Sequence, residues 1–155
     1  MIVTKNDGLL VLLTNAYLLK SQFVNSIIWR GKKLKAEYFF HELLFKLKVN
    51  NSDIYQFEIF FYSLMRLRPL VLLKPIKMGA IVYRVAAPIS QHRKRLFAVK
   101  SLLDSSMNKN GAISIDRIFD LFLMVYFLKK NPALDKKAQV YSEAVDNISF
   151  VRFIK

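Results

Sequence analysis

Apolar side chains recur at every third or fourth position through most of this chain, and that spacing limits the fold more than any other feature. It places apolar groups along one face of an α-helix, and such a face must be buried against other helices. The helices predicted in this way cover residues 16–29, 35–48, 54–66, 93–107, 114–130 and a last segment from 135 onward. We therefore expect residues 1–155 to form one mainly α domain of six helices, with residues 1–15 as an N-terminal extension.

The helical spacing is interrupted between the third and fourth helices by a pattern typical of a β-hairpin. Residues 70–74 and 81–86 are strand-like, with β-branched and aromatic residues clustered around residues 77–80. Gly79 lies between them, where a tight turn needs its backbone freedom. We expect a hairpin over residues 70–89. Pro75 has no amide hydrogen to donate, so it predicts a bulge or an edge position in the first strand.

A few single residues carry more local predictions. Ser114 is expected to cap the fifth helix and Asp135 the sixth, because each has a side-chain oxygen that can accept from first-turn amides. In the third helix, the apolar spacing predicts that Phe57 is buried. Trp29 and the phenylalanines fit core packing better than a platform for stacking nucleobases.

The charge balance indicates the kind of partner. The chain has 25 Lys and Arg against 11 Asp and Glu, a formal net charge of +14. A compact body this basic repels itself, so the charge indicates a nucleic acid or an anionic membrane surface. Because 54% of the residues are hydrophobic, intrinsic disorder is excluded. The absence of cysteine excludes a disulfide framework and a thiolate metal site.

No acidic residue occurs between Glu58 and Asp104. The cations in that stretch are Arg66, Arg68, Lys74, Lys77, Arg84, Arg93, Lys94, Arg95 and Lys100. They have no local carboxylate to pair with, which favours a phosphate-binding surface over a merely solvated basic face. Some of them open the fourth helix, whose N-terminus adds a partial positive charge.

Two smaller basic groups lie at predicted turns between helices. The first is Arg30, Lys32, Lys33 and Lys35, and the second is Lys129, Lys130, Lys136 and Lys137. The first group alone is weak evidence for a phosphate site, because basic turns are often merely solvated. For the second group the two interpretations are nearly even, because lysines at a helix C-terminus also complement the helix dipole.

Catalysis and membrane insertion find no support in the sequence. His41 and His92 have no metal-ligand companion at suitable spacing, and no phosphate loop, nucleophile elbow or carboxylate pair is present. We therefore expect no enzyme activity, no cofactor and no metal. The longest apolar runs, 9–13 and 121–128, fall well short of the roughly 20 residues needed to cross a membrane. A peripheral membrane protein with a basic amphipathic surface remains the rival interpretation, and a DNA-binding regulator lacks a visible recognition-helix pair.

The residue usage indicates an AT-rich genome. Phe, Tyr, Ile, Asn and Lys, whose codons are AT-rich, are abundant. Lysines outnumber arginines by 17 to 8, although the planar guanidinium of Arg binds phosphate with better geometry. The first residues lack the Arg- and Ser-rich amphipathic pattern of a transit peptide. We therefore expect an organelle-encoded protein of the mitochondrion, with a plastid or the cytoplasm of an AT-rich bacterium as alternatives.

Three blocks of residues occur in an order that is more specific than any one of them. The first comprises Phe23-Val24-Asn25, Gly31-Lys32-Lys33 and Ala36-Glu37. The second comprises Glu58, Phe60, Leu64, Pro69, Gly79, Tyr83, Val85, Arg93-Lys94-Arg95 and Ala98. The third comprises Lys136-Lys137, Asn147, Ser149 and Phe150. In this order the blocks resemble the small-subunit ribosomal protein seven family, of the bacterial and organellar type.

The resemblance implies a six-helix domain with a protruding hairpin. It also implies a structural constituent of the small ribosomal subunit that binds the 3′ major domain of its rRNA and helps assemble the head. The implied partners are small-subunit rRNA, neighbouring head proteins, and tRNA and mRNA near the exit site. The positions that match the family for RNA contact are Lys32, Lys33, Lys74, Lys77, Arg84, Arg93, Lys94, Arg95, Lys136 and Lys137. The charge pattern adds Lys35, Arg66, Arg68 and Lys100.

The chain also departs from the family's pattern. Ala80 replaces a usual second glycine, and Ile76 and Met78 stand where the hairpin is usually richer in arginine, so the chain departs from the family at the tip, where the resemblance implies contacts with tRNA. The fifth helix is unusually apolar between residues 118 and 128. It is equally compatible with a seat for an additional ribosomal protein and with a larger core.

Overall fold

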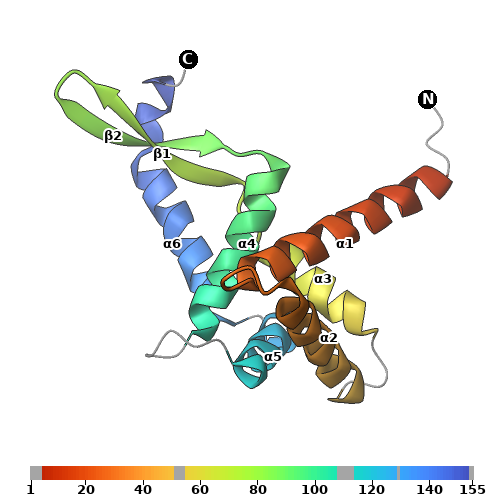
Figure 1. Ribbon diagram of the computed structural model, residues 1–155. Coiled ribbons are helices and arrows are strands. Elements are labelled where there is room, and N and C mark those ends of the chain that lie inside the picture. Colours follow the sequence, from red (N-terminus) through yellow and green to blue (C-terminus); the bar gives the residue numbers. More distant parts are fainter. Residues whose placement is uncertain (1–4, 51–54, 108–113, 129, 154–155) are drawn as a thin grey trace.

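The computed structural model describes residues 5–50, 55–107, 114–128 and 130–153. Within these ranges the elements are α1 (Lys5–Ile27), α2 (Lys33–Asn50), α3 (Gln56–Leu67), β1 (Val71–Met78), β2 (Ile81–Pro88), α4 (Gln91–Ser106), α5 (Ile115–Leu123), the π-helix η1 (Met124–Leu128), α6 (Pro132–Asp146) and the 3-10 helix η2 (Ile148–Phe153). The expected mainly α fold, with six helices and a hairpin between the third and fourth, is confirmed (Figure 1).

Four phenylalanines from four different helices form the centre of the core. Phe23 of α1, Phe40 of α2, Phe60 of α3 and Phe122 of α5 are each at most 3% exposed. The centroid of the Phe60 ring lies 5.3–5.4 Å from those of the other three rings. Tilted and edge-to-face pairs of this kind contribute about 0.5–1.5 kcal/mol each beyond the burial of their area. The four helices therefore pack around a single aromatic centre.

The prediction that Phe57 is buried is wrong, because its side chain is 54% exposed. Helix α3 begins at Gln56, so Phe57 lies in its first turn. Helical side chains lean toward the N-terminus of their helix, and one in the first turn therefore extends past the packed part of the element. Ile59, Phe60 and Leu64 fill the core instead.

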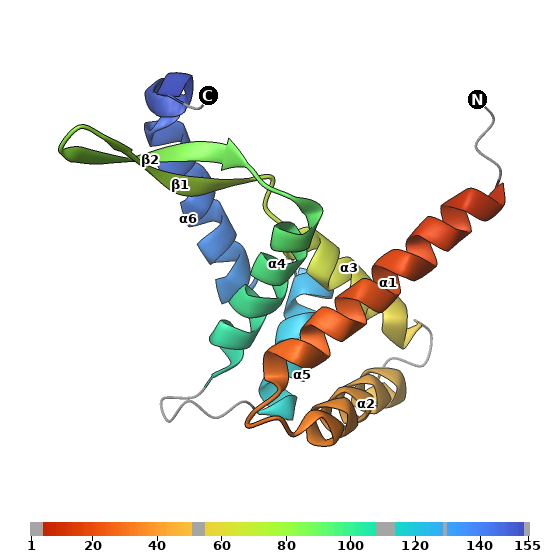
Figure 2. The ribbon, with the colours of Figure 1, turned by 45° about the horizontal axis from the view of Figure 1, so that its top comes forward.

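Helix α1 begins at Lys5 rather than at residue 16. The residues between them contain no proline to stop a helix that extends back from the packed segment. Most of the stretch that the sequence sets apart as an N-terminal extension is therefore helical. Figures 1 and 2 both show this half of α1 projecting away from the other helices.

The prediction that Asp135 caps the sixth helix is also wrong. The Oδ1 atom of Asn131 accepts a hydrogen bond of 2.7 Å from the backbone amide of Ala133. Its Nδ2 atom donates one of 3.0 Å to the carbonyl of Leu121. Pro132 then begins α6, where its missing amide hydrogen costs no helical bond. Asp135 lies in the first turn, and the buried Asn131 joins α6 to α5.

The fifth helix is shorter than its apolar spacing predicts and changes form. Ser114 occupies the N-cap position of α5, as expected, although its side chain makes no capping hydrogen bond. The α-helix ends at Leu123 and continues as the π-helix η1. The buried members of this apolar stretch are Ile118, Leu121, Phe122 and Val125, and the exposed ones are Met124, Phe127 and Leu128. Part of the stretch is therefore core, and the rest forms an apolar surface.

The hairpin projects from the helical body beside α6 and η2 (Figure 1). Its strands pair without an offset from Val71↔Pro88 to Met78↔Ile81, so Pro75 causes no bulge. Each strand of a two-stranded sheet is an edge, where proline is tolerated. Gly79 has a φ of +63°, which confirms the turn predicted there.

Candidate nucleic-acid interface

Most of the predicted phosphate-binding cations stand without a carboxylate partner. They lie at the α1–α2 junction, along the hairpin and on α4, three segments far apart in the sequence. On these segments, and apart from the buried Arg95, those that form no ion pair with a described carboxylate are Lys32, Lys35, Lys74, Lys77, Arg93, Lys94 and Lys100. All of them are exposed except Lys94, which is half-buried. Their charge is therefore available to an anion.

Three further predicted contacts form loose ion pairs at the surface. These are Lys33–Glu37 at 3.8 Å, Arg84–Glu143 at 3.8 Å and Lys136–Asp104 at 3.5 Å. Exposed pairs of this kind contribute about 1 kcal/mol or less. A phosphate can therefore compete with the carboxylate for each of these cations. Lys130 is exposed, whereas Lys129 lies outside the described residues.

Lys137 is held by the fold rather than presented to solution. Its Nζ atom donates a hydrogen bond of 2.8 Å to the carbonyl of Arg66 and lies 5.7 Å from the centroid of the Tyr141 ring. Burial, and secondarily the charge of Arg66, lowers the pKa of Lys137. These contacts tie α6 to the end of α3, so this lysine supports the surface more than it forms it.

Among the predicted RNA contacts, Arg95 differs most from expectation. Its place in the run Arg93-Lys94-Arg95 predicts an exposed side chain. It is only 8% exposed, and its Nε atom donates a hydrogen bond of 3.3 Å to Oε1 of Gln22 on α1. The amide nitrogen of Gln22 in turn lies 2.8 Å from Nδ1 of His92. Arg95 and His92 thus help hold α4 against α1, while Arg93 in the same turn remains exposed.

Arg68 lies close enough to Arg95 for the two charges to interact. The Nε and Nη2 atoms of Arg68 are buried and have no hydrogen-bond partner among the described residues. Burial first, and then the charge of Arg95, lowers the pKa of Arg68. A buried donor without a partner costs about 1–3 kcal/mol, and more when it is charged. The pair therefore forms a site at which an anion would relieve both the missing hydrogen bonds and the repulsion.

The hairpin cations are divided between its two faces. Cross-strand partners share a face, and successive residues of a strand alternate between faces. The pairs Pro75↔Arg84 and Lys77↔Val82 therefore place Arg84 and Lys77 together. Lys74 pairs with the buried Val85 and lies on the opposite face. Lys77 and Arg84 therefore share one face of the hairpin, and Lys74 is exposed on the face that also carries the buried Val85.

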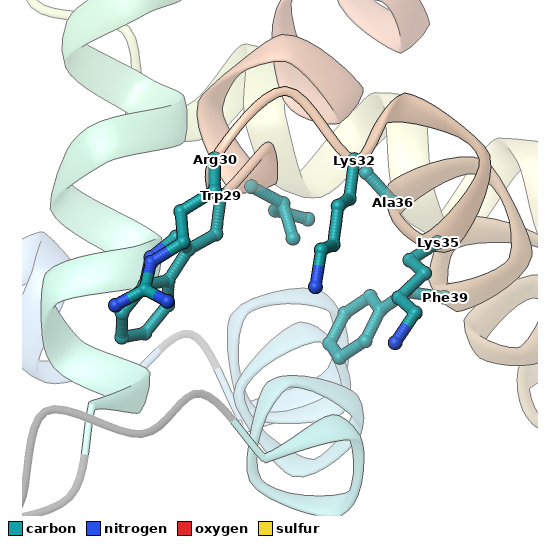
Figure 3. Close-up of a pocket in the computed structure, with 7 residues that line it drawn as sticks. Trp29, Arg30, Lys32, Lys35, Ala36 and Phe39 are labelled. Carbon is teal, nitrogen blue, oxygen red and sulfur yellow. The ribbon is translucent and has the colours of Figure 1, made fainter.

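The exposed position of Trp29 is a feature of the candidate interface that the sequence did not predict. The expectation that Trp29 packs in the core is wrong, because it is 69% exposed. The guanidinium of Arg30 lies 5.6 Å from the centroid of its ring. Figure 3 shows these two side chains together at one side of a hollow, with Lys35 and Phe39 at the other and Lys32 between them. Its exposure could have been predicted from its position, because Trp29 lies at the end of a predicted helix and directly before a basic turn.

The part of the chain that the structure describes contains neither a metal-ligand cluster nor a membrane-spanning helix. No group of three or more His, Cys, Asp or Glu side chains there is placed to hold a metal ion. No described helix combines the length and the apolar character needed to cross a membrane.

Comparison with known proteins identifies the class to which this fold and basic surface belong, the protein constituents of ribosomes. The family model described as "Ribosomal protein S7p/S5e" matches residues 5–148. The chain therefore belongs to the ribosomal protein S7p/S5e family, and the resemblance drawn from its motifs is confirmed.

Several bacterial relatives bear the name small ribosomal subunit protein uS7. The one from a Nitratiruptor species is 24% identical over 86% of this chain and 85% of its own length. Those from Pelagibacter ubique and Koribacter versatilis are each 26% identical, over 85% and 87% of this chain and 83% and 85% of their own lengths. The likeness thus extends over most of each protein.

Proposed function

We propose that this ribosomal protein is a structural constituent of the small subunit and binds its rRNA through cations from three segments. The segments are the α1–α2 junction, the hairpin and α4. The observation that carries the proposal is the set of exposed cations without a described carboxylate partner, Lys32, Lys35, Lys74, Lys77, Arg93 and Lys100. Membership of the S7p/S5e family and the names of the relatives support it.

The proposed binding mode is recognition of RNA shape. A-form RNA hides the base edges of its major groove, so cations that bind several backbones sense the arrangement of helices rather than their sequence. The packed helices keep the three segments at fixed separations. We propose the 3′ major domain of the rRNA as the target, with a role in head assembly and a hairpin near the exit-site tRNA and the mRNA.

The proposed residues divide into two sets. Contacts from the surface are assigned to Lys32, Lys33, Lys35, Lys74, Lys77, Arg84, Arg93, Lys94, Lys100 and Lys136. Arg66, Arg68, Arg95 and Lys137 are assigned to the same interface from partly or fully buried positions, where Arg68 and Arg95 would receive a phosphate that enters between α1, α3 and α4.

We propose the mitochondrion as the location, because the residue usage is typical of a protein encoded by an AT-rich genome. Cofractionation of the endogenous protein with the small subunit of mitochondrial ribosomes is the expected result. Recovery with ribosomes of another compartment would reject this assignment while leaving the proposed RNA binding intact.

The salt dependence of RNA binding tests the proposal. Each phosphate contact releases counterions, so affinity for a head-domain rRNA fragment should fall steeply as salt rises. Replacing both Arg93 and Lys94 with Ala should weaken binding and reduce the slope of log K against log salt by about two, roughly one for each contact. Replacing the exposed Lys130 with Ala serves as the control and should change the slope much less.

Two outcomes would reject the proposed function. One is an affinity that does not change between low and moderate salt, because phosphate contacts cannot behave in that way. The other is binding to anionic vesicles together with indifference to structured RNA, which would favour a membrane-surface protein.

A further inference from the structure

The junction of α1 and α2 forms a hollow next to the single tryptophan of the chain. The hollow has a volume of about 420 Å³. Its aromatic walls are Trp29 and Phe39, and its cations are Arg30, Lys32 and Lys35. Figure 3 shows the side chains of Trp29, Lys32 and Phe39 extending to the same side of the junction.

The backbone of this junction holds the tryptophan in place. The amide of Lys32 donates a hydrogen bond of 3.1 Å to the carbonyl of Trp29, which closes a four-residue turn. Both central residues have positive φ, 50° at Arg30 and 74° at Gly31, as in a type I′ turn. A left-handed backbone is unfavourable for a residue with a side chain. The chain maintains this conformation at Arg30, whose guanidinium lies over the Trp29 ring.

The ring retains free surface for another planar group. With Arg30 over it at 5.6 Å, Trp29 is still 69% exposed. A large aromatic side chain left in water loses the stabilisation that its burial would give, so the exposed face of Trp29 can gain free energy by stacking against another planar group.

The charge around the hollow indicates the chemistry of that partner. None of its lining residues is acidic, and the nearby Glu37 is paired with Lys33 at 3.8 Å. Lys32 and Lys35 form no ion pair with the described carboxylates. An aromatic face beside unpaired cations is the arrangement that binds an unstacked base together with its phosphate. An apolar peptide would gain nothing from the cations.

We propose that this hollow holds an unpaired nucleobase of the bound RNA, stacked on Trp29, with the adjoining phosphate at Lys32 and Lys35. The inference rests on the proposed RNA binding and adds a local contact to it. Recognition of RNA by this chain then includes one single-stranded nucleotide in addition to the backbone of folded helices.

Intrinsic fluorescence tests the proposal directly, because Trp29 is the only tryptophan. Titration with a head-domain rRNA fragment should quench its emission and reduce its accessibility to acrylamide. Stacking on an aromatic side chain contributes about 1–3 kcal/mol per base. Trp29→Ala should therefore weaken binding roughly 5- to 150-fold, and Trp29→Phe should retain most of the affinity.

Matched variants separate stacking from charge. Trp29→Ala removes no charge, so the slope of log K against log salt should stay unchanged, whereas Lys32→Ala should reduce it by about one. Tyr55→Ala is the aromatic control, because Tyr55 is 84% exposed and lies outside the hollow. It should leave the affinity unchanged. Circular dichroism would verify that each variant is folded.

The outcomes distinguish this inference from the proposed function. Steep salt-dependent RNA binding with unchanged Trp29 fluorescence and full affinity of Trp29→Ala would overturn the stacking and leave RNA binding in place. Absence of RNA binding would overturn both. Quenching by anionic vesicles but not by RNA would assign the hollow to a membrane surface and overturn the inference.

Discussion

At the scale of single residues, Arg68 shows a conflict between stability and binding. Its buried Nε and Nη2 atoms have no partner among the described residues, and the charge of Arg95 lies nearby. Replacing a buried and unsatisfied charge with an apolar group of similar length removes that penalty. We predict that Arg68→Met raises the free energy of unfolding of the free protein by about 1–3 kcal/mol. The same variant should bind rRNA more weakly, since a phosphate would lose its guanidinium partner. Urea unfolding and RNA titration measure the two effects.

Lys100→Met is the matched control for Arg68→Met. Lys100 is exposed on α4 and pairs with no described carboxylate, so this replacement should change stability by about 0.5 kcal/mol or less. Loss of stability in Arg68→Met would contradict the prediction, because it would mean that Arg68 is well satisfied in the free protein.

At the scale of elements, Asn131 determines where α6 begins. Its side chain both caps α6 and donates to the carbonyl of Leu121. Loss of an N-cap costs about 1 kcal/mol, and loss of a buried hydrogen bond costs about 1–3 kcal/mol. We predict that Asn131→Ala lowers the free energy of unfolding by about 2–4 kcal/mol. Asn131→Ser keeps an oxygen that can accept at the cap position and loses the donor to Leu121, so it should have an intermediate effect. Chemical denaturation compares the variants.

Asp135→Ala distinguishes this structural assignment from the expectation based on sequence. Asp135 lies in the first turn of α6, where it contributes only through the helix dipole, about 0.3–1 kcal/mol. If Asp135→Ala were more destabilising than Asn131→Ala, the cap would lie at Asp135 after all.

The same elements show what a sequence can predict about this fold. Apolar spacing located at least the packed part of each of the six described α-helices, because burial of one face determines the element, and the break in that spacing located the hairpin. It did not predict the 3-10 helix η2. The ends were less predictable, since Pro132 reads equally well as the end of one helix and the start of the next. Phe57 and Trp29 both lie at helix ends, where the spacing no longer tells whether a neighbouring element covers the side chain.

Within the candidate interface, the burial of Arg95 could have been predicted from the apolar spacing of α4, although the run of basic residues favoured an exposed position. On α4 the buried residues Ala98, Val99, Leu102 and Leu103 continue backward at helical spacing to Arg95. Arg95 therefore lies on the buried face, although the run Arg93-Lys94-Arg95 reads as one basic cluster. The missing partners of Arg68 were not predictable, because they depend on which groups from distant segments approach it.

At the scale of the whole molecule, the net charge of +14 should make free and bound protein respond oppositely to salt. Raising the ionic strength from about 0.01 M to about 0.1 M shortens the Debye length from about 30 Å to about 10 Å and screens repulsion among the cations. The urea midpoint of the free protein should therefore rise, with its m-value unchanged because the same surface is exposed on unfolding.

RNA affinity should fall over the same range of salt, because counterion release then yields less free energy. In the rRNA complex the phosphates already neutralise the cations, so the stability of the bound protein should fall with salt as the complex weakens. Thermal unfolding with and without an rRNA fragment measures both trends. A fall in the stability of the free protein with rising salt, as in the complex, would contradict the prediction. It would mean that repulsion among these cations does not destabilise the free fold, and the excess charge would then need an explanation other than an RNA partner.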